Sequence, residues 1–168
     1  MTVPLTSEDR ALDEAILALM QRVTEQAILP RYQNLATGDV EDKGGNDPVT
    51  IADKDSEALL REGLSAIDGT LAFVGEETAH ADPSILDRLD RPCWIVDPID
   101  GTLFFSEGKE GFAVSIALVD KSGTPLVGVI YDPANDVLYE TTIGNPVLVN
   151  NHPFKEDTKT SHPITLVL

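Results

Sequence analysis

The sequence predicts an α+β fold in which two long helices pack on a mostly antiparallel sheet of about six strands. Three observations support this prediction. Apolar residues recur at helical spacing in two long segments towards the N-terminus. Short apolar segments separated by turn residues follow them, and residues 112–119 alternate large and small side chains as a strand does. The chain has 168 residues, 42% of them hydrophobic, which suffices for one domain with a buried core.

The two helices are predicted from their start signals and their apolar stripes. The first begins around Thr6–Asp9, which supplies a capping hydroxyl and early acids, and its stripe continues until Pro30. Residues 38–48 are rich in Gly, Asp and Lys and predict a loop. The second helix follows, with Asp53 in its first turn and Gly69 at its end.

Short apolar segments predict the strands of the sheet. Residues 121–124 and 132–136 have turn composition, so the strands beside them form an antiparallel meander. A short helix is expected around residues 84–89, and residues 155–161 are polar and linker-like. The predicted strands are residues 71–74, 94–96, 112–119, 126–131 and 137–140, with 147–149 as an extension and 164–168 as the start of a further strand.

The chain is strongly acidic, with 29 Asp and Glu against 12 Lys and Arg and a net charge of −17. This balance argues against nonspecific binding to a nucleic-acid polymer or to an anionic membrane, because both need basic surfaces. Most of the acids are expected to be solvated. If the substrate is an anion, a protein of this kind is expected to bind it through metal ions or backbone dipoles.

Cysteine use and hydropathy bear on the cellular compartment. The single cysteine, Cys93, excludes an internal disulfide, and its place before an apolar strand favours a buried thiol over a nucleophile. No apolar run approaches the roughly 18–20 residues of a membrane span. The first residues lack the basic and apolar pattern of a signal peptide. We therefore expect a cytoplasmic protein without a membrane partner.

The segment Trp94–Thr102, with the sequence WIVDPIDGT, contains the strongest functional pattern. Asp97 and Asp100 place two carboxylates at a turn after a short strand, and carboxylates are the ligands that hard cations prefer. Backbone N–H groups at Gly101 and Thr102 suit an anion if a helix begins there. A cation site beside a phosphate site provides the ingredients of metal-assisted phosphate ester hydrolysis.

Further candidate ligands fall at the ends of predicted elements. Asp53 lies at a helix start and Glu76 follows a strand, so these carboxylates are candidates for a shared metal site. Taken singly, each residue has an ordinary explanation. Asp97 and Asp100 suit a turn, Asp53 suits a first helical turn, Thr102 suits an N-cap, and Glu76, Glu77 and Lys43 suit a solvated loop. Their combination and order along the chain favour a common function.

This combination resembles the inositol monophosphatase superfamily of magnesium-dependent, lithium-sensitive phosphatases, which includes the 3′(2′),5′-bisphosphate nucleotidases. The segment Trp94–Thr102 is similar to the first signature of that superfamily. Gly75–Glu77 and Asp47–Asp53 match upstream motifs, and the similarity continues through Phe112–Leu118 and Gly128–Tyr131. The resemblance implies the N-terminal half of the layered αβαβα sugar-phosphatase fold.

The resemblance also implies a metal site. Glu76, Asp97, Asp100 and the backbone carbonyl of Ile99 would ligate magnesium, and Asp53 would bind a further ion. Two or three Mg²⁺ ions are implied as cofactors, with Li⁺ as an inhibitor. On this basis residues 1–154 would form an N-terminal metal-binding domain. Residues 155–168 would be a linker and the first strand of a C-terminal domain that is otherwise absent from the sequence.

Catalytic roles follow from the same resemblance. Thr102 and Glu76 would position the attacking water, and Asp53 would accept a hydrogen bond from Thr102. Gly101, Thr102 and Asp100 would bind the substrate phosphate, and Lys43 is a weaker candidate. The implied reaction is direct in-line attack by a metal-activated water, without a phosphoenzyme.

Two functions remain open from the sequence. The first is a magnesium-dependent phosphomonoesterase that hydrolyses a small phosphorylated metabolite, either an inositol monophosphate or a 3′(2′),5′-bisphosphate nucleotide. Residues 110–119 together with Gly128–Tyr131 resemble the bacterial 3′(2′),5′-bisphosphate nucleotidases somewhat more closely. The second is a truncated, catalytically incomplete metal-binding half-domain that acts as an oligomeric or interaction module, because the second family signature is missing and Trp94 is the only tryptophan. A homodimer is expected with either function.

Overall fold

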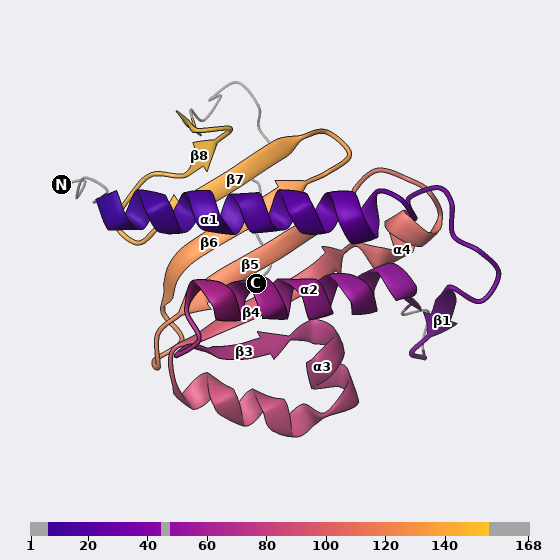
Figure 1. The fold of residues 1–168 in the computed structure, drawn as a ribbon, viewed down its shortest axis with the longest axis horizontal. Coiled ribbons are helices and arrows are strands. Elements are labelled where there is room, and N and C mark those ends of the chain that lie inside the picture. The colour runs from indigo at the N-terminus through magenta and orange to yellow at the C-terminus, as the bar shows by residue number, and fades with distance from the viewer. Residues whose placement is uncertain (1–6, 45–47, 155–168) are drawn as a thin grey trace, which may run out of the picture.

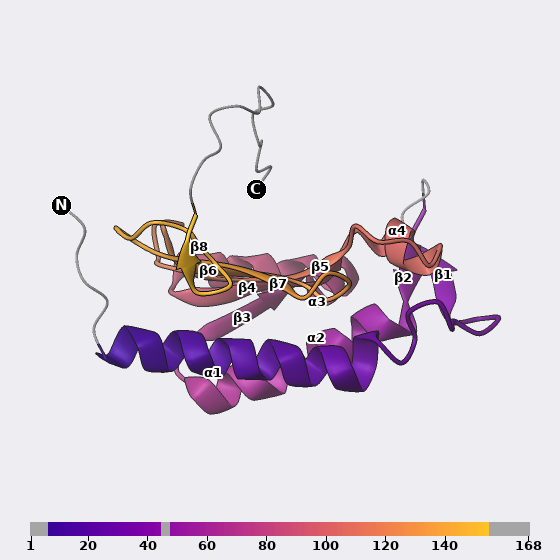
Figure 2. The same ribbon diagram turned by 90° about the horizontal axis from the view of Figure 1, so that it is seen from above.

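The computed structural model describes residues 7–44 and 48–154, in which two long helices cover one face of a sheet (Figures 1 and 2). Helices α1 (Ser7–Val23) and α2 (Ile51–Ile67) lie side by side on that face. The predicted first helix differs in one respect: after Val23 it continues as a π-helix, η1 (Thr24–Ile28). The predicted linker and strand within residues 155–168 lie outside the described residues.

Helix α2 starts where it does because of a capping box. The Thr50 hydroxyl accepts hydrogen bonds from the backbone N–H groups of Ala52 and Asp53, while the Asp53 carboxylate accepts one from the Thr50 N–H. Asp53 is in the first turn, as predicted, but its side chain is fully buried. The helix ends at Ile67 with Asp68 as its C-cap, slightly before the predicted Gly69.

The sheet has seven strands, one more than predicted, in the order β3-β4-β5-β6-β7-β8-β9. Strands β3 and β4 are parallel and the other neighbours are antiparallel, so the predicted meander and fold class are confirmed. The strands are β3 (Ala72–Gly75), β4 (Cys93–Asp100), β5 (Ala113–Val119), β6 (Pro125–Asp132), β7 (Val137–Thr142), β8 (Leu148–Val149) and β9 (His152–Pro153).

Short elements connect these strands. The crossover from β3 to β4 contains α3 (Glu76–Ala81) and the 3₁₀ helix η2 (Pro83–Asp90), which corresponds to the predicted short helix. Helix α4 (Thr102–Ser106) follows β4. The predicted loop at residues 38–48 contains a small antiparallel pair, β1 (Val40–Asp42) and β2 (Pro48–Thr50).

The sheet buries apolar residues on both faces. The main core lies between the helices and the sheet and includes Ile16, Leu60 and Trp94. A smaller cluster on the other face includes Ile85 of η2 and Cys93, whose complete burial confirms the prediction of a structural thiol. Within residues 7–44 and 48–154, no helix combines the length and apolar character that a membrane crossing requires.

Candidate active site

The C-terminal end of β4 holds the first group of candidate residues. The sequence predicted that Asp97 and Asp100 follow a strand ending at Val96, but β4 extends to Asp100. Its pairing with β5 is regular up to Asp97 and resumes at Asp100, with a register shift between them. This irregularity interrupts the regular ladder where the carboxylates lie. Both carboxylates therefore lie within the distorted end of the strand rather than in a separate turn.

Gly101 makes the transition from β4 to α4. Its φ of +88° lies in the left-handed region, and a Cβ added there would be 2.6 Å from the carbonyl oxygen of Gly111. Both facts require glycine at this position. Gly101 is the N-cap of α4, so the alternative interpretation of Thr102 as the N-cap is wrong. Thr102 is instead the first helical residue.

The Thr102 hydroxyl joins two parts of the chain that are distant in sequence. Its oxygen lies 3.0 Å from Oδ1 of Asp53 and 2.9 Å from the carbonyl oxygen of Ile99. The other Asp53 oxygen accepts hydrogen bonds from the backbone and side chain of Thr50. Burial nevertheless raises the pKa of Asp53. The contact between Asp53 and Thr102 implied by the family resemblance is therefore present.

Like charges crowd around Asp97. Burial, the neighbouring charges of Glu76 and Asp100, and a hydrogen bond with Glu76 raise the pKa of Asp97 to about 8. The side chain thus resists ionisation near neutral pH in the absence of a cation. A divalent cation would reverse this preference, because its charge favours the carboxylate form of every neighbouring acid.

Lys43 is part of this cluster, although it suited a solvated loop lysine in the sequence. Its Nζ lies 3.1 Å from a Glu76 oxygen and 2.8 Å from a Glu77 oxygen, and 5% of its side chain is exposed. Burial opposes the charged ammonium, but the hydrogen bonds to Glu77 and Glu76 outweigh it and raise the Lys43 pKa. The lysine therefore supplies local positive charge to two of the acids.

Glu57 positions the cluster and was missed in the sequence. Its carboxylate accepts hydrogen bonds from the backbone N–H groups of Glu77, at 2.6 Å, and Thr78, and from the Thr78 hydroxyl. It also forms an ion pair with Arg61 at 2.9 Å. Glu57 thereby fixes the start of α3, where Glu76 lies. A sequence signal existed, because an acid four residues after Asp53 falls on the buried stripe of α2.

The donor chemistry of the cluster fits a hard cation. Glu76, Asp97 and Asp100 are carboxylates, the charges of Glu76 and Asp100 help to raise the pKa of Asp97, and the Ile99 carbonyl oxygen is a further possible ligand. Among the described residues, however, no three His, Cys, Asp or Glu side chains are grouped so that they could hold an ion. The acids therefore lie near one another but are not arranged as a complete set of metal ligands, and one Glu76 oxygen accepts a hydrogen bond from Lys43.

Comparisons with known proteins agree with this arrangement. "Inositol monophosphatase 2" of Solanum lycopersicum is 39% identical over 112 residues, which cover 66% of this chain and 42% of the relative. "3'(2'),5'-bisphosphate nucleotidase CysQ" of Escherichia coli (strain K12) is 34% identical over 128 residues, which cover 74% of this chain and 50% of the relative. The structure of extragenic suppressor protein suhB from Bartonella henselae matches this fold with a TM-score of 0.67 at 30% sequence identity. The match covers 88% of this chain and 54% of that protein.

The match is extensive along this chain but partial along its relatives. The chain spans about half the length of the curated relatives it matches. Residues 9–167 match the profile described as the inositol monophosphatase family. That range includes α2, β4 and the whole carboxylate cluster. The chain therefore belongs to the inositol monophosphatase family.

Proposed function

We propose that this chain carries the catalytic centre of a magnesium-dependent phosphomonoesterase that acts on a small phosphorylated metabolite. The observation that supports it best is the contact of Thr102 with Asp53 beside the crowded carboxylates Glu76, Asp97 and Asp100. A hydroxyl held by a buried acid, next to acids that favour a cation, is an arrangement suited to positioning a water for attack on a phosphate.

The Thr102 hydroxyl has one proton and two candidate acceptors, Asp53 Oδ1 and the Ile99 carbonyl. While it donates to either, its oxygen lone pairs can accept a hydrogen bond from water. The Thr50 N–H donates a hydrogen bond to the Asp53 carboxylate and so fixes its orientation. The Thr102 hydroxyl, which contacts the other oxygen of that carboxylate, therefore has a fixed location as well. We assign Thr102 the role of orienting the attacking water, together with Glu76.

The proposed metal ligands are Glu76, Asp97, Asp100, the Ile99 carbonyl and Asp53. Bound Mg²⁺ would lower the pKa of water and neutralise charge on the phosphate oxygens. Gly101 and Thr102 would offer backbone N–H groups to the substrate phosphate, with Asp100 beside them. Lys43 would balance part of the negative charge when the cation is absent, through its contacts with Glu76 and Glu77.

Two substrate classes are consistent with the relatives, which include inositol monophosphatases and bisphosphate nucleotidases. The experiment is phosphate release from inositol 1-phosphate and from adenosine 3′,5′-bisphosphate by the purified 168-residue chain. We expect Mg²⁺-dependent turnover that Li⁺ inhibits. Asp97→Asn should abolish turnover, whereas Asp87→Asn, on the exposed surface of η2, should not.

A second candidate function is a non-catalytic module that self-associates. It is favoured by two exposed apolar residues on the sheet face opposite α1 and α2: Ile95 is 38% exposed and Tyr139 is 42% exposed. Both alternate with residues buried under the helices. A folded chain without turnover that forms dimers in sedimentation experiments would support this module. A monomer with Mg²⁺-dependent turnover would exclude it.

A further inference from the structure

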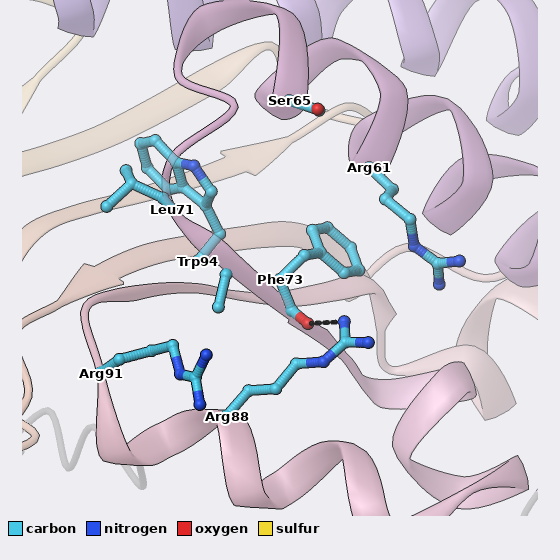
Figure 3. A pocket seen from close by; sticks show the side chains of 8 residues that line it. Arg61, Ser65, Leu71, Phe73, Arg88, Arg91 and Trp94 are labelled. Atoms are coloured by element: carbon cyan, nitrogen blue, oxygen red, sulfur yellow. Dashed lines mark hydrogen bonds between the residues drawn. The ribbon is translucent and has the colours of Figure 1, made fainter.

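A cavity that Lys43 and the carboxylate cluster do not line lies elsewhere in the molecule. It has a volume of about 250 Å³ and lies at the free edge of β3, between α2 and η2 (Figure 3). Three arginines reach it from two segments: Arg61 comes from α2, while Arg88 and Arg91 come from η2 and the residue that follows it. None of the eight described residues lining it is acidic.

The arginine cluster contrasts with the rest of the molecule. The whole chain has 12 Lys and Arg residues and a net charge of −17, yet three of its arginines share this one cavity. Charges farther away than the Debye length of about 8 Å at physiological salt are screened. A ligand inside the cavity is therefore influenced mainly by these guanidinium groups and by Glu57 and Asp90, which pair with two of them, rather than by the net charge.

Each guanidinium is oriented but retains free donors. Arg88 donates one hydrogen bond, of 3.2 Å, to the Phe73 carbonyl at the strand edge. Arg91 pairs through Nε with Asp90, leaving both terminal nitrogens without a hydrogen bond in the described contacts. Arg61 lies over the Phe73 ring, 5.0 Å from its centroid, and pairs with Glu57 through one nitrogen. A guanidinium carries five N–H donors, so these contacts leave most of them free.

The rest of the cavity wall is apolar and aromatic. Leu71, Phe73 and Trp94 line it, and Figure 3 shows Trp94 beside Leu71. Trp94 is 1% exposed, and its indole N–H has no hydrogen-bond partner among the described residues. A buried donor without a partner is costly, and such groups in native proteins call for an explanation. An acceptor in the cavity would provide one.

We propose that this cavity binds a small organic anion in which a phosphate monoester, or a phosphonate of the same charge, is joined to a flat apolar group. A dianion suits three guanidinium groups better than a carboxylate does, because each charge-assisted hydrogen bond strengthens with the charge of the acceptor. The flat group would contact Leu71, Phe73 and Trp94. None of the residues proposed for catalysis lines the cavity.

The site lies outside the proposed active site but shares one neighbour with it. Arg61 lines this cavity and also the cavity beside Lys43 and Glu77. Arg61 also contacts Glu57 and Thr78, which hold the start of α3. The test therefore leaves Arg61 unchanged and uses Arg88 and Arg91, which have no described contact with the carboxylate cluster.

Trp94 is the only tryptophan, so its fluorescence reports directly on this cavity. The probe is phenylphosphonate, titrated into the full chain in buffer freed of divalent ions by a chelating resin. We expect saturable fluorescence changes, with affinity about tenfold weaker in Arg88→Gln and in Arg91→Gln. Benzoate should bind more weakly than phenylphosphonate, and benzyl alcohol should not bind.

Controls separate this site from the net charge and from the active site. Arg22→Gln, which removes the same charge at the end of α1, should leave the affinity unchanged, as should Asp97→Asn. Circular dichroism checks that each variant is folded. The proposal is overturned if phenylphosphonate gives no saturable signal, or if Arg22→Gln weakens binding as much as Arg88→Gln or Arg91→Gln does. If phenylphosphonate affinity fell in Asp97→Asn but not in Arg88→Gln or Arg91→Gln, the fluorescence signal would report binding at the active site, and the proposal would be overturned.

Discussion

Gly101 shows how one residue fixes the geometry of the candidate active site. Its positive φ lets the chain turn sharply from β4 into α4, and the absence of a side chain lets Gly111 pack against it. The Thr102 hydroxyl, which follows directly, then reaches Asp53 on another element. The location of the hydroxyl thus depends on a backbone conformation that glycine adopts at little cost.

Replacing Gly101 with alanine should destabilise the protein more than the same change at a matched glycine. Gly123 has a φ of +79° but no atom within 4 Å of its added Cβ, so Gly123→Ala should cost only the left-handed backbone term of roughly 1–2 kcal/mol. Gly101→Ala adds a clash with the Gly111 carbonyl, for a total of about 2–4 kcal/mol. Urea unfolding measures both variants, and equal losses would contradict the role given to the Gly111 contact.

The raised pKa of Asp97 predicts a pH dependence in the metal-free protein. Between the unfolded pKa of about 3.9 and the folded pKa of about 8, the folded state holds a proton that the unfolded state has lost. The free energy of unfolding should therefore fall as pH rises through this window, by at most ~1.4 kcal/mol per pH unit.

Asp97→Asn isolates this effect because asparagine has no proton to release. Urea unfolding between about pH 5 and pH 8 should give a shallower slope in this variant than in the wild type. Asp87→Asn, at an exposed position, should keep the wild-type slope. If Asp97→Asn and the wild type had equal slopes, Asp97 would be ionised in the folded protein across this range.

At the scale of the element, α3 depends on α2. The six-residue helix α3 begins at Glu76, and two of its first N–H groups donate to Glu57 rather than to water. A Cβ added at Gly75, just before it, would lie 2.3 Å from the Glu57 carboxyl carbon, so any larger residue there would displace this carboxylate. Because Glu57 is 3% exposed, its loss would leave N–H groups without their acceptor.

Glu57→Ala should therefore destabilise the protein by about 2–4 kcal/mol, measured by urea unfolding. Glu57→Gln should cost less, because its amide oxygen can still accept one of the hydrogen bonds. Glu62→Ala, an exposed position on the same helix, serves as the control and should have little effect. Hydrogen exchange should show faster exchange at Glu77 and Thr78 in the alanine variant. Protection unchanged at these two amides would contradict the capping role of Glu57.

At the scale of the whole molecule, the net charge of −17 and the carboxylate cluster should respond differently to salts. Monovalent salt screens general repulsion, whereas a cation that binds the folded state adds free energy according to its affinity. At equal ionic strength, MgCl₂ should therefore raise the melting temperature more than NaCl does. Calorimetry measures both shifts.

Asp97→Asn distinguishes specific binding from screening in the same experiment. The variant should lose the additional shift in MgCl₂ and keep the shift in NaCl. Asp87→Asn, an exposed acid on η2, should keep both. Equal shifts in the two salts for the wild type would mean that the described carboxylates do not bind Mg²⁺ in this chain.

The sequence alone determined the fold class and supplied the candidate residues of the proposed site. Helical periodicity marked α1 and α2, and turn residues marked the antiparallel strands, because these signals are local. The ordered motifs around Asp53, Glu76 and Thr102 led to the family, which the comparisons confirm. The same local signals placed the end of β4 too early, since the strand continues through Pro98 only with an irregular pairing to β5.

Tertiary structure decided which distant side chains meet, although the family resemblance had implied one of these contacts, that of Thr102 with Asp53. The contact of Thr102 with Asp53 spans 49 residues, and that of Lys43 with Glu76 spans 33, so neither follows from local spacing. Lys43 and Glu57 are ordinary charged residues in the sequence, and only their burial in the fold gives them specific roles. Lys43 forms ion pairs with the acids, and Glu57 caps the N-terminus of α3. The cavity with its arginines likewise exists only because α2 and η2 both pack against β3, which brings distant positive charges together.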